Sequence, residues 1–288
     1  MSAATKAQAK DKLENFIIKI GYPDKWKDYS GLQVDDSLSL YENMGNISEF
    51  FAKDAIARKV NKPVDKMEWG MTPQTINAYY NPTTNEICFP AAILQPPFFD
   101  PSADDAMNYG GIGGVIGHEM SHGFDDQGSQ FDKTGNQHNW WTAADKKNFE
   151  ARTKILVDHF NKIELAGKKV NGQMTLGENI GDNGGLNIAF RALQNVMKTE
   201  KLGVKDGFTP EQRFFLAWAR VWAGNARPEY LQYLMTVDVH SPNEARVNGA
   251  LPMVDSWYKA FNIKKGDKEN RSSGPANPSA VAWKHIPG

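Results

Sequence analysis

The chain has 288 residues, enough for one large domain or two small ones and for a sizeable hydrophobic core. Its formal net charge of −1 gives no electrostatic signature for nucleic acid or an anionic membrane, so we expect no nucleic-acid partner. No run of about 18 apolar residues could form a transmembrane segment, and the single cysteine, Cys88, excludes an internal disulfide or a cysteine-based zinc site.

The N-terminal third is predicted to contain two helices. The apolar spacing of residues 5–20 favours an amphipathic helix that ends at Gly21-Tyr22-Pro23. Its apolar face would consist of Leu13, Phe16, Ile17 and Ile20. A second helix is expected over residues 38–60, before Pro63.

Residues 75–90 have the composition of a β-hairpin. Two short β-type runs flank the turn sequence Asn81-Pro82-Thr83-Thr84. The strand Ile76–Tyr80 could pair with an extended peptide through main-chain hydrogen bonds, and Asn77 could add amide donors. A purely structural hairpin is the alternative.

The remaining chain is predicted to be mostly helical. The glycines of residues 108–114 are expected to let a helix pack closely against a neighbouring element. Further helices are expected over residues 142–164, 176–199, 210–225, 228–235 and 252–261. Residues 268–288 are rich in Ser, Gly, Pro and Asn and are expected to form a disordered tail.

Residues 117–122 carry the motif H-E-x-x-H. On a helix, His118 and His122 lie one turn apart on the same face, where both imidazoles can bind one Zn²⁺ ion. Glu119 lies next to the first histidine and can reach a metal-bound water without binding the metal itself. The motif also occurs by chance, so the rest of the site must be found elsewhere in the chain.

A catalytic zinc ion requires a third protein ligand and one open position. Glu178 and Asp182 are four residues apart and therefore share a helix face. Glu178 can bind the metal, and Asp182 can accept the ring N–H of a ligand histidine. An ordinary solvated acidic face is the alternative for such a pair.

Amide hydrolysis also requires a donor for the oxyanion. His240, which Asp238 could orient, is a candidate for this role. Arg246 offers a forked donor for a substrate carbonyl or carboxylate group. A lone histidine or arginine is more often a surface or structural residue, which remains the alternative here.

Several longer motifs occur in the order in which they occur in one known family. With the motifs above, the chain resembles the catalytic lobe of the neprilysin family of zinc metalloendopeptidases, of the bacterial endopeptidase O type. The resembling segments include Asn77-Ala78-Tyr79-Tyr80, Phe89-Pro90-Ala91-Ala92-Ile93-Leu94-Gln95-Pro96-Pro97-Phe98-Phe99, Asn108-Tyr109-Gly110-Gly111-Ile112-Gly113, Arg227-Pro228-Glu229-Tyr230 and Asp238-Val239-His240-Ser241-Pro242.

The resemblance implies a mainly helical α+β fold, a thermolysin-like zincin lobe with a small sheet along the cleft. It implies one zinc ion per chain, held by His118, His122 and Glu178, and peptides as substrates. Glu119 would be the general base, Asp182 would orient a zinc histidine, and His240 would stabilise the oxyanion.

The resemblance also implies how a peptide is bound. Asn77 and the backbone of Ala78 would hold the substrate main chain, and Arg246 would bind a carbonyl group. An apolar pocket formed by Phe98, Val115 and Trp222 would select bulky apolar residues after the scissile bond, although plain core packing is the alternative for these three.

The chain departs from the family at its N-terminal end. Family members carry a large N-terminal helical lid, so residues 1–267 are expected to form a catalytic domain that lacks it. The alternative function is therefore a zinc-binding but inactive lobe that needs the missing region for turnover. The surface that the lid would cover is also expected to leave apolar side chains exposed, through which the chain would associate. One cysteine favours a bacterial-type member, cytoplasmic, periplasmic or secreted depending on the missing region.

Overall fold

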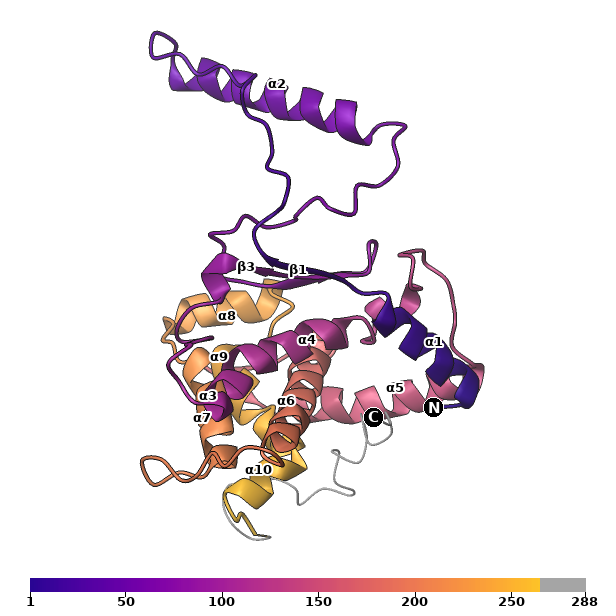
Figure 1. The fold of residues 1–288 in the computed structure, drawn as a ribbon, viewed down its shortest axis with the longest axis vertical. Coiled ribbons are helices and arrows are strands. Elements are labelled where there is room, and N and C mark those ends of the chain that lie inside the picture. Colours follow the sequence, from indigo (N-terminus) through magenta and orange to yellow (C-terminus); the bar gives the residue numbers. More distant parts are fainter. Residues whose placement is uncertain (265–288) are drawn as a thin grey trace.

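The computed structural model describes residues 1–264 and confirms a mainly helical α+β fold (Figure 1). The predicted boundary at residue 267 and the predicted tail 268–288 lie outside these residues. The helices are α1 (Ala3–Glu14), α2 (Leu40–Lys59), α3 (Asp105–Asn108), α4 (Gly114–His122), α5 (Ala143–Phe160), α6 (Leu176–Val196), α7 (Pro210–Val221), α8 (Pro228–Val237), α9 (Asn243–Asn248) and α10 (Asp255–Ala260). No helix of residues 1–264 has the length and apolarity needed to cross a membrane.

A three-stranded sheet lies along one side of the helices (Figure 1). Its strands are β1 (Ile17–Gly21), β2 (Tyr79–Asn81) and β3 (Glu86–Pro90), in the order β1-β3-β2. The central strand β3 is buried throughout, pairs in parallel with β1 and pairs antiparallel with β2. A small second hairpin is formed by β4 (Glu164–Leu165) and β5 (Lys168–Lys169).

The predicted helix over residues 5–20 is wrong in its second half. Helix α1 ends at Glu14, and residues 17–21 form β1 instead. The β-branched Ile17, Ile18 and Ile20 favour a strand, and β3 provides a partner for it. The predicted apolar face is also wrong, because Thr5 and Lys12 are the buried residues of α1.

Two further predictions are corrected. Residues 76–78 are not part of the hairpin strand, which begins at Tyr79. The predicted helix over residues 252–261 is a 3₁₀ turn (Leu251–Met253) followed by α10, and the preceding helix α9 was not predicted. The hairpin and the helices expected over 38–60, 142–164, 176–199 and 228–235 are confirmed to within a few residues at their ends.

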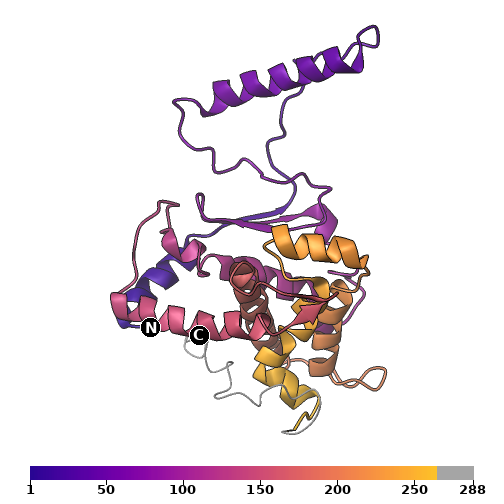
Figure 2. The same ribbon diagram turned by 180° about the vertical axis from the view of Figure 1, so that it is seen from behind.

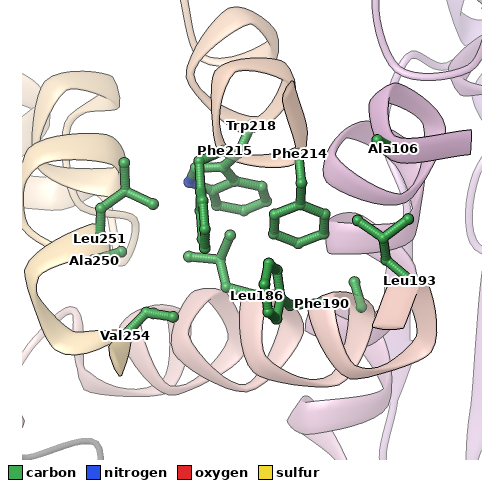
Figure 3. Packing of buried hydrophobic residues seen from close by; sticks show 11 residues of the cluster. Ala106, Leu186, Phe190, Leu193, Phe214, Phe215, Trp218, Ala250, Leu251 and Val254 are labelled. Carbon is green, nitrogen blue, oxygen red and sulfur yellow. The ribbon is translucent and has the colours of Figure 1, made fainter. Parts of the chain in front are cut away.

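The largest core cluster joins α6 to α7 (Figure 3). Leu186 and Phe190 of α6 face Phe214, Phe215 and Trp218 of α7, and all five are buried. Val254 and its neighbours close the far side of this cluster. Burial of these aromatic side chains is a large favourable contribution to folding and fixes α6 in place.

Glycines bring α4 and α6 into close contact, as the sequence predicts for the glycine-rich segment. A Cβ atom at Gly117 of α4 would lie 2.8 Å from the Cα atom of Gly185 of α6, and a Cβ atom at Gly185 would collide with the carbonyl oxygen of Gly114. Any larger residue at these positions would separate the helices. The two helices that carry the candidate metal ligands therefore touch backbone to backbone.

Helix α2 stands apart from the rest of the molecule in both views (Figures 1 and 2). None of its 20 residues is buried, and apolar side chains such as Leu40 and Tyr41 are 79% and 88% exposed. Its start is fixed by a capping box between Ser39 and Glu42. Local capping and propensity, rather than packing against the body, thus define this helix.

Candidate active site

Three side chains from α4 and α6 converge on one point. The Nε2 atoms of His118 and His122 lie 2.9 Å apart. The carboxylate of Glu178 lies 3.3 Å from Nε2 of His118 and 3.6 Å from Nε2 of His122. The structure therefore places the two histidines of the H-E-x-x-H motif and the predicted third ligand together.

This donor set fits a zinc ion. A zinc ion bound at 2.0–2.1 Å with tetrahedral angles separates its ligand atoms by about 3.3 Å, which lies within the observed spread. The buried Oε2 atom of Glu178 has no hydrogen-bond partner among residues 1–264. Burial alone would raise the pKa of Glu178, but the imidazole of His118 and its neighbours hold it below its ordinary range. A deprotonated carboxylate is the form that binds metal.

Each of the two imidazoles has a carboxylate behind it. The Nδ1 atom of His118 lies 2.9 Å from Oδ1 of Asp182, and the Nδ1 atom of His122 lies 2.7 Å from Oδ2 of Asp125. A carboxylate only accepts hydrogen bonds, so Nδ1 of each ring is the donor to it. Both histidines are therefore oriented with Nε2 toward the shared point, the atom that a metal would bind.

Asp182 is fully buried and is itself held by Arg246. Its two oxygens accept hydrogen bonds of 2.8 Å and 2.6 Å from Nε and Nη2 of Arg246. Burial would raise the pKa of Asp182, but the guanidinium outweighs this and keeps it below its usual value. The guanidinium also stacks 3.7 Å from the centre of the Trp222 ring. Arg246 thus supports the His118 side of the site from α9.

Glu119 is 5% exposed and lies beside the converging ligands. Burial raises the pKa of its carboxyl, and the charge of Glu178 adds to this, while the neighbouring imidazoles oppose it. A carboxyl whose pKa lies above its ordinary value accepts a proton more readily than an exposed carboxylate does, as a general base must.

His240 reaches the site from the loop after α8. Its Nε2 atom lies 3.3 Å from Oε2 of Glu178, and its Nδ1 atom lies 2.7 Å from Oδ1 of Asp238. The loop is tied to α6 by a buried hydrogen bond of 2.7 Å from Ser241 to Asn179. The side chain of His240 is 45% exposed, so a bound substrate can reach it.

All of the predicted site residues but Asp182 line one cavity of about 740 Å³. Its apolar part includes Phe98, Val115 and Trp222, and Nε1 of Trp222 has no hydrogen-bond partner among residues 1–264. Asn77 and Ala78 line it just before β2. Strand β2 is at the edge of the sheet, and no other strand of residues 1–264 pairs with its outer side. Asp182 lies behind His118, outside this lining.

Sequence reasoning missed Asp125, Asn179 and Ser241. Asp125 follows His122 at the i,i+3 spacing and could have been found as a partner of the second imidazole. The contact between Ser241 and Asn179 joins residues 62 positions apart, and no local pattern signals it.

The chain is similar to one known family of peptidases. The model of peptidase family M13 matches residues 77–275. Neprilysin-11 of Caenorhabditis elegans is 38% identical over 98% of this chain and 34% of its own length. Neutral endopeptidase of Lactobacillus helveticus is 40% identical over 93% of this chain and 40% of its own length. The chain thus spans between a third and two fifths of these curated relatives.

Solved structures show the same similarity. A zinc metalloprotease of Mycobacterium tuberculosis, crystallised with an inhibitor, is 47% identical, with a TM-score of 0.90 over 93% of this chain and 42% of that one. The PepO protein of Lactobacillus rhamnosis is 37% identical, with a TM-score of 0.85 over 94% of this chain and 42% of that one.

Proposed function

Because the chain belongs to peptidase family M13, we propose that it is the catalytic lobe of a zinc-dependent endopeptidase. The observation that carries this proposal is the convergence of two imidazole nitrogens and one carboxylate within 2.9–3.6 Å. His118, His122 and Glu178 would hold one zinc ion. When bound, zinc supplies a Lewis acid that polarises the peptide carbonyl and lowers the pKa of water.

The side chains around the ligands have distinct roles in the proposed reaction. Glu119 takes a proton from the attacking water and passes it to the nitrogen of the leaving amine. His240, oriented by Asp238, donates a hydrogen bond to the carbonyl oxygen as negative charge develops there. Asp182 and Asp125 keep the two imidazoles in place throughout.

The cavity supports a peptide substrate bound in an extended conformation. The outer edge of β2 is available for main-chain hydrogen bonds, and Asn77 and Ala78 lie at its start. We propose that Phe98, Val115 and Trp222 receive a bulky apolar side chain from the residue after the scissile bond. Arg246 lines the same cavity, and we propose that its guanidinium also contacts a substrate carbonyl.

The test is cleavage of an end-blocked peptide with one central Phe or Leu, with and without a zinc chelator. We expect cleavage on the amino side of the apolar residue, abolished by the chelator and by Glu119→Gln, which retains zinc. Glu49→Gln, an exposed glutamate paired with Lys53, is the matched control and should cleave normally. Cleavage that survives Glu119→Gln would show that the assigned base is wrong.

The alternative is a lobe that binds zinc but does not turn over. This alternative would explain why α2 has exposed apolar side chains: another part of a longer protein would cover them. One zinc ion per chain without cleavage of any peptide would favour it. Chelator-sensitive cleavage by the isolated chain would exclude it.

A further inference from the structure

Lys12, on α1, makes an unusual set of contacts for a lysine. Only 1% of it is exposed, and its Nζ atom donates hydrogen bonds to the carbonyl oxygens of Gly123, Gly128 and Phe131, at 2.7, 2.7 and 2.8 Å. Burial lowers its pKa to about 8, although Asp125 and Asp132 oppose the shift. At pH 7 the ammonium is therefore protonated and has one N–H for each carbonyl.

These carbonyls belong to the loop that holds Asp125. The loop starts at Gly123, directly after the candidate ligand His122, and Asp125 lies between two of the residues that Lys12 binds. Oδ2 of Asp125 faces His122, while Oδ1 accepts hydrogen bonds from the backbone N–H groups of Gln127 and Gly128. The position of the Asp125 carboxylate is thus set by the backbone to which Lys12 is bound.

The loop packs directly against the backbone of His122. A Cβ atom at Gly128 would collide with the carbonyl oxygen of His122, so the two backbone segments are in direct contact. A Cβ atom at Gly123 would lie 2.6 Å from the ring of Phe16, which follows α1. The N-terminal segment therefore contacts the loop twice, through Lys12 of α1 and through the ring of Phe16.

We propose that Lys12 is a positioning residue for the metal site: it binds both ends of the loop around Asp125 and so fixes the carboxylate that orients His122. This proposal rests on the proposed zinc site and adds to it a determinant from a distant helix, 111 residues away in the sequence. The loss of Lys12 leaves three carbonyl oxygens without this donor, and the loop can then shift with Asp125.

The first measurement is the zinc dissociation constant of the whole chain, by competition with a chelator. Lys12→Met has a similar volume but no donor, and we expect it to weaken zinc binding about tenfold. Lys12→Arg, which keeps charged donors, should restore most of the affinity. Lys12→Gln, which keeps two N–H donors, provides a milder second variant if Lys12→Met does not fold.

A matched control separates positioning from general stability. Lys19 is also buried, and its Nζ atom is bound to Glu86 and to the carbonyl oxygen of Glu68, each at 2.7 Å, in the sheet. Lys19→Met should destabilise the fold without changing zinc affinity. In a double-mutant cycle, Lys12→Met should have little further effect on an Asp125→Ala background, because both act on the same imidazole.

A second readout needs no metal. In the metal-free chain, the Nδ1–H proton of His122 should give a protected NMR signal that Lys12→Met weakens and Lys19→Met leaves intact. Three results would each overturn the proposal. They are a zinc affinity of Lys12→Met within twofold of wild type, an equal loss of zinc affinity in Lys19→Met, and fully additive effects of Lys12→Met and Asp125→Ala on zinc affinity. If the wild type binds no zinc, the proposed function fails, and the His122 signal alone decides the role of Lys12.

Discussion

Replacement of Gly181 by alanine tests whether the glycines of α6 hold the metal site together. Gly181 lies on α6 opposite the ring of His118, and a Cβ atom there would lie 2.7 Å from both Cε1 and Nδ1 of that ring. Ordinary carbon contacts are about 3.5–4.0 Å, so the ring must retreat by about 0.8 Å or more. Metal–ligand distances tolerate only about 0.2 Å.

The expected loss is one of zinc affinity rather than of folding. Displacement of His118 also disturbs its bond to Asp182, and we expect zinc binding to weaken by about 10- to 100-fold, or about 1.4–2.8 kcal/mol. For the metal-free chain, replacement of a helical glycine contributes about 0.5–1 kcal/mol of stability, whereas overpacking costs about 1–3 kcal/mol. The net destabilisation is therefore about 0–2.5 kcal/mol, which is less than the stability of a typical domain, about 5–15 kcal/mol, so the variant should remain folded.

The assay is chelator competition for zinc, together with urea unfolding of the metal-free protein. Gly113→Ala is the matched control, because a Cβ atom there would make ordinary contacts of 3.4–3.7 Å. Zinc affinity in Gly181→Ala within twofold of wild type would refute the reasoning. So would an equal loss in Gly113→Ala, since that change moves no ligand.

Three further outcomes are expected. Asp125→Ala and Asp182→Ala should each weaken zinc binding about 10- to 100-fold. Only Asp182→Ala should also cost about 3–5 kcal/mol of stability, because it leaves the buried guanidinium of Arg246 unpaired. Equal unfolding midpoints of the two variants in urea would contradict this. Hydrogen bonds from Ser2 keep the pKa of Asp145 below its ordinary value. The ionised carboxylate therefore stabilises the fold above about pH 4, and this stabilisation is lost as the pH falls and Asp145 is protonated. The gap in melting temperature between metal-free wild type and Asp145→Asn should therefore narrow on acidification, and a constant gap would disprove the link. Finally, exposed apolar residues of α2 should cause association at micromolar concentration in sedimentation, reduced by Tyr41→Glu; a monomeric wild type would argue against it.

The first ligands could be predicted because their geometry is local. The spacing of His118 and His122, and that of Glu178 and Asp182, follows directly from the helical repeat. Their meeting across two helices is a tertiary fact, and it depends on glycines such as Gly117 and Gly185 that allow close contact. The glycine-rich composition pointed to such contact but did not identify the partner.

The N-terminal segment could not be predicted in the same way. The strand Ile17–Gly21 depends on a parallel partner, β3, that follows it by more than 60 residues. Helical periodicity marked Leu13 as an apolar-face residue, whereas Lys12 beside it is the buried one. A buried lysine is stable only where carbonyl oxygens are already arranged around it, and no pattern within α1 reveals those of a distant loop.

The position of α2 has a consequence for how the chain can vary in length. Residues 22–67 leave the sheet after β1 and return at Glu68, whose carbonyl oxygen is bound by Lys19 of the same strand. The two ends of this excursion are therefore held together by the side chain of Lys19. Doubling the length of such a loop costs only about 0.6 kcal/mol in closure entropy. Insertions or deletions here would change how far α2 reaches, while the helices that carry the metal ligands keep the same packing.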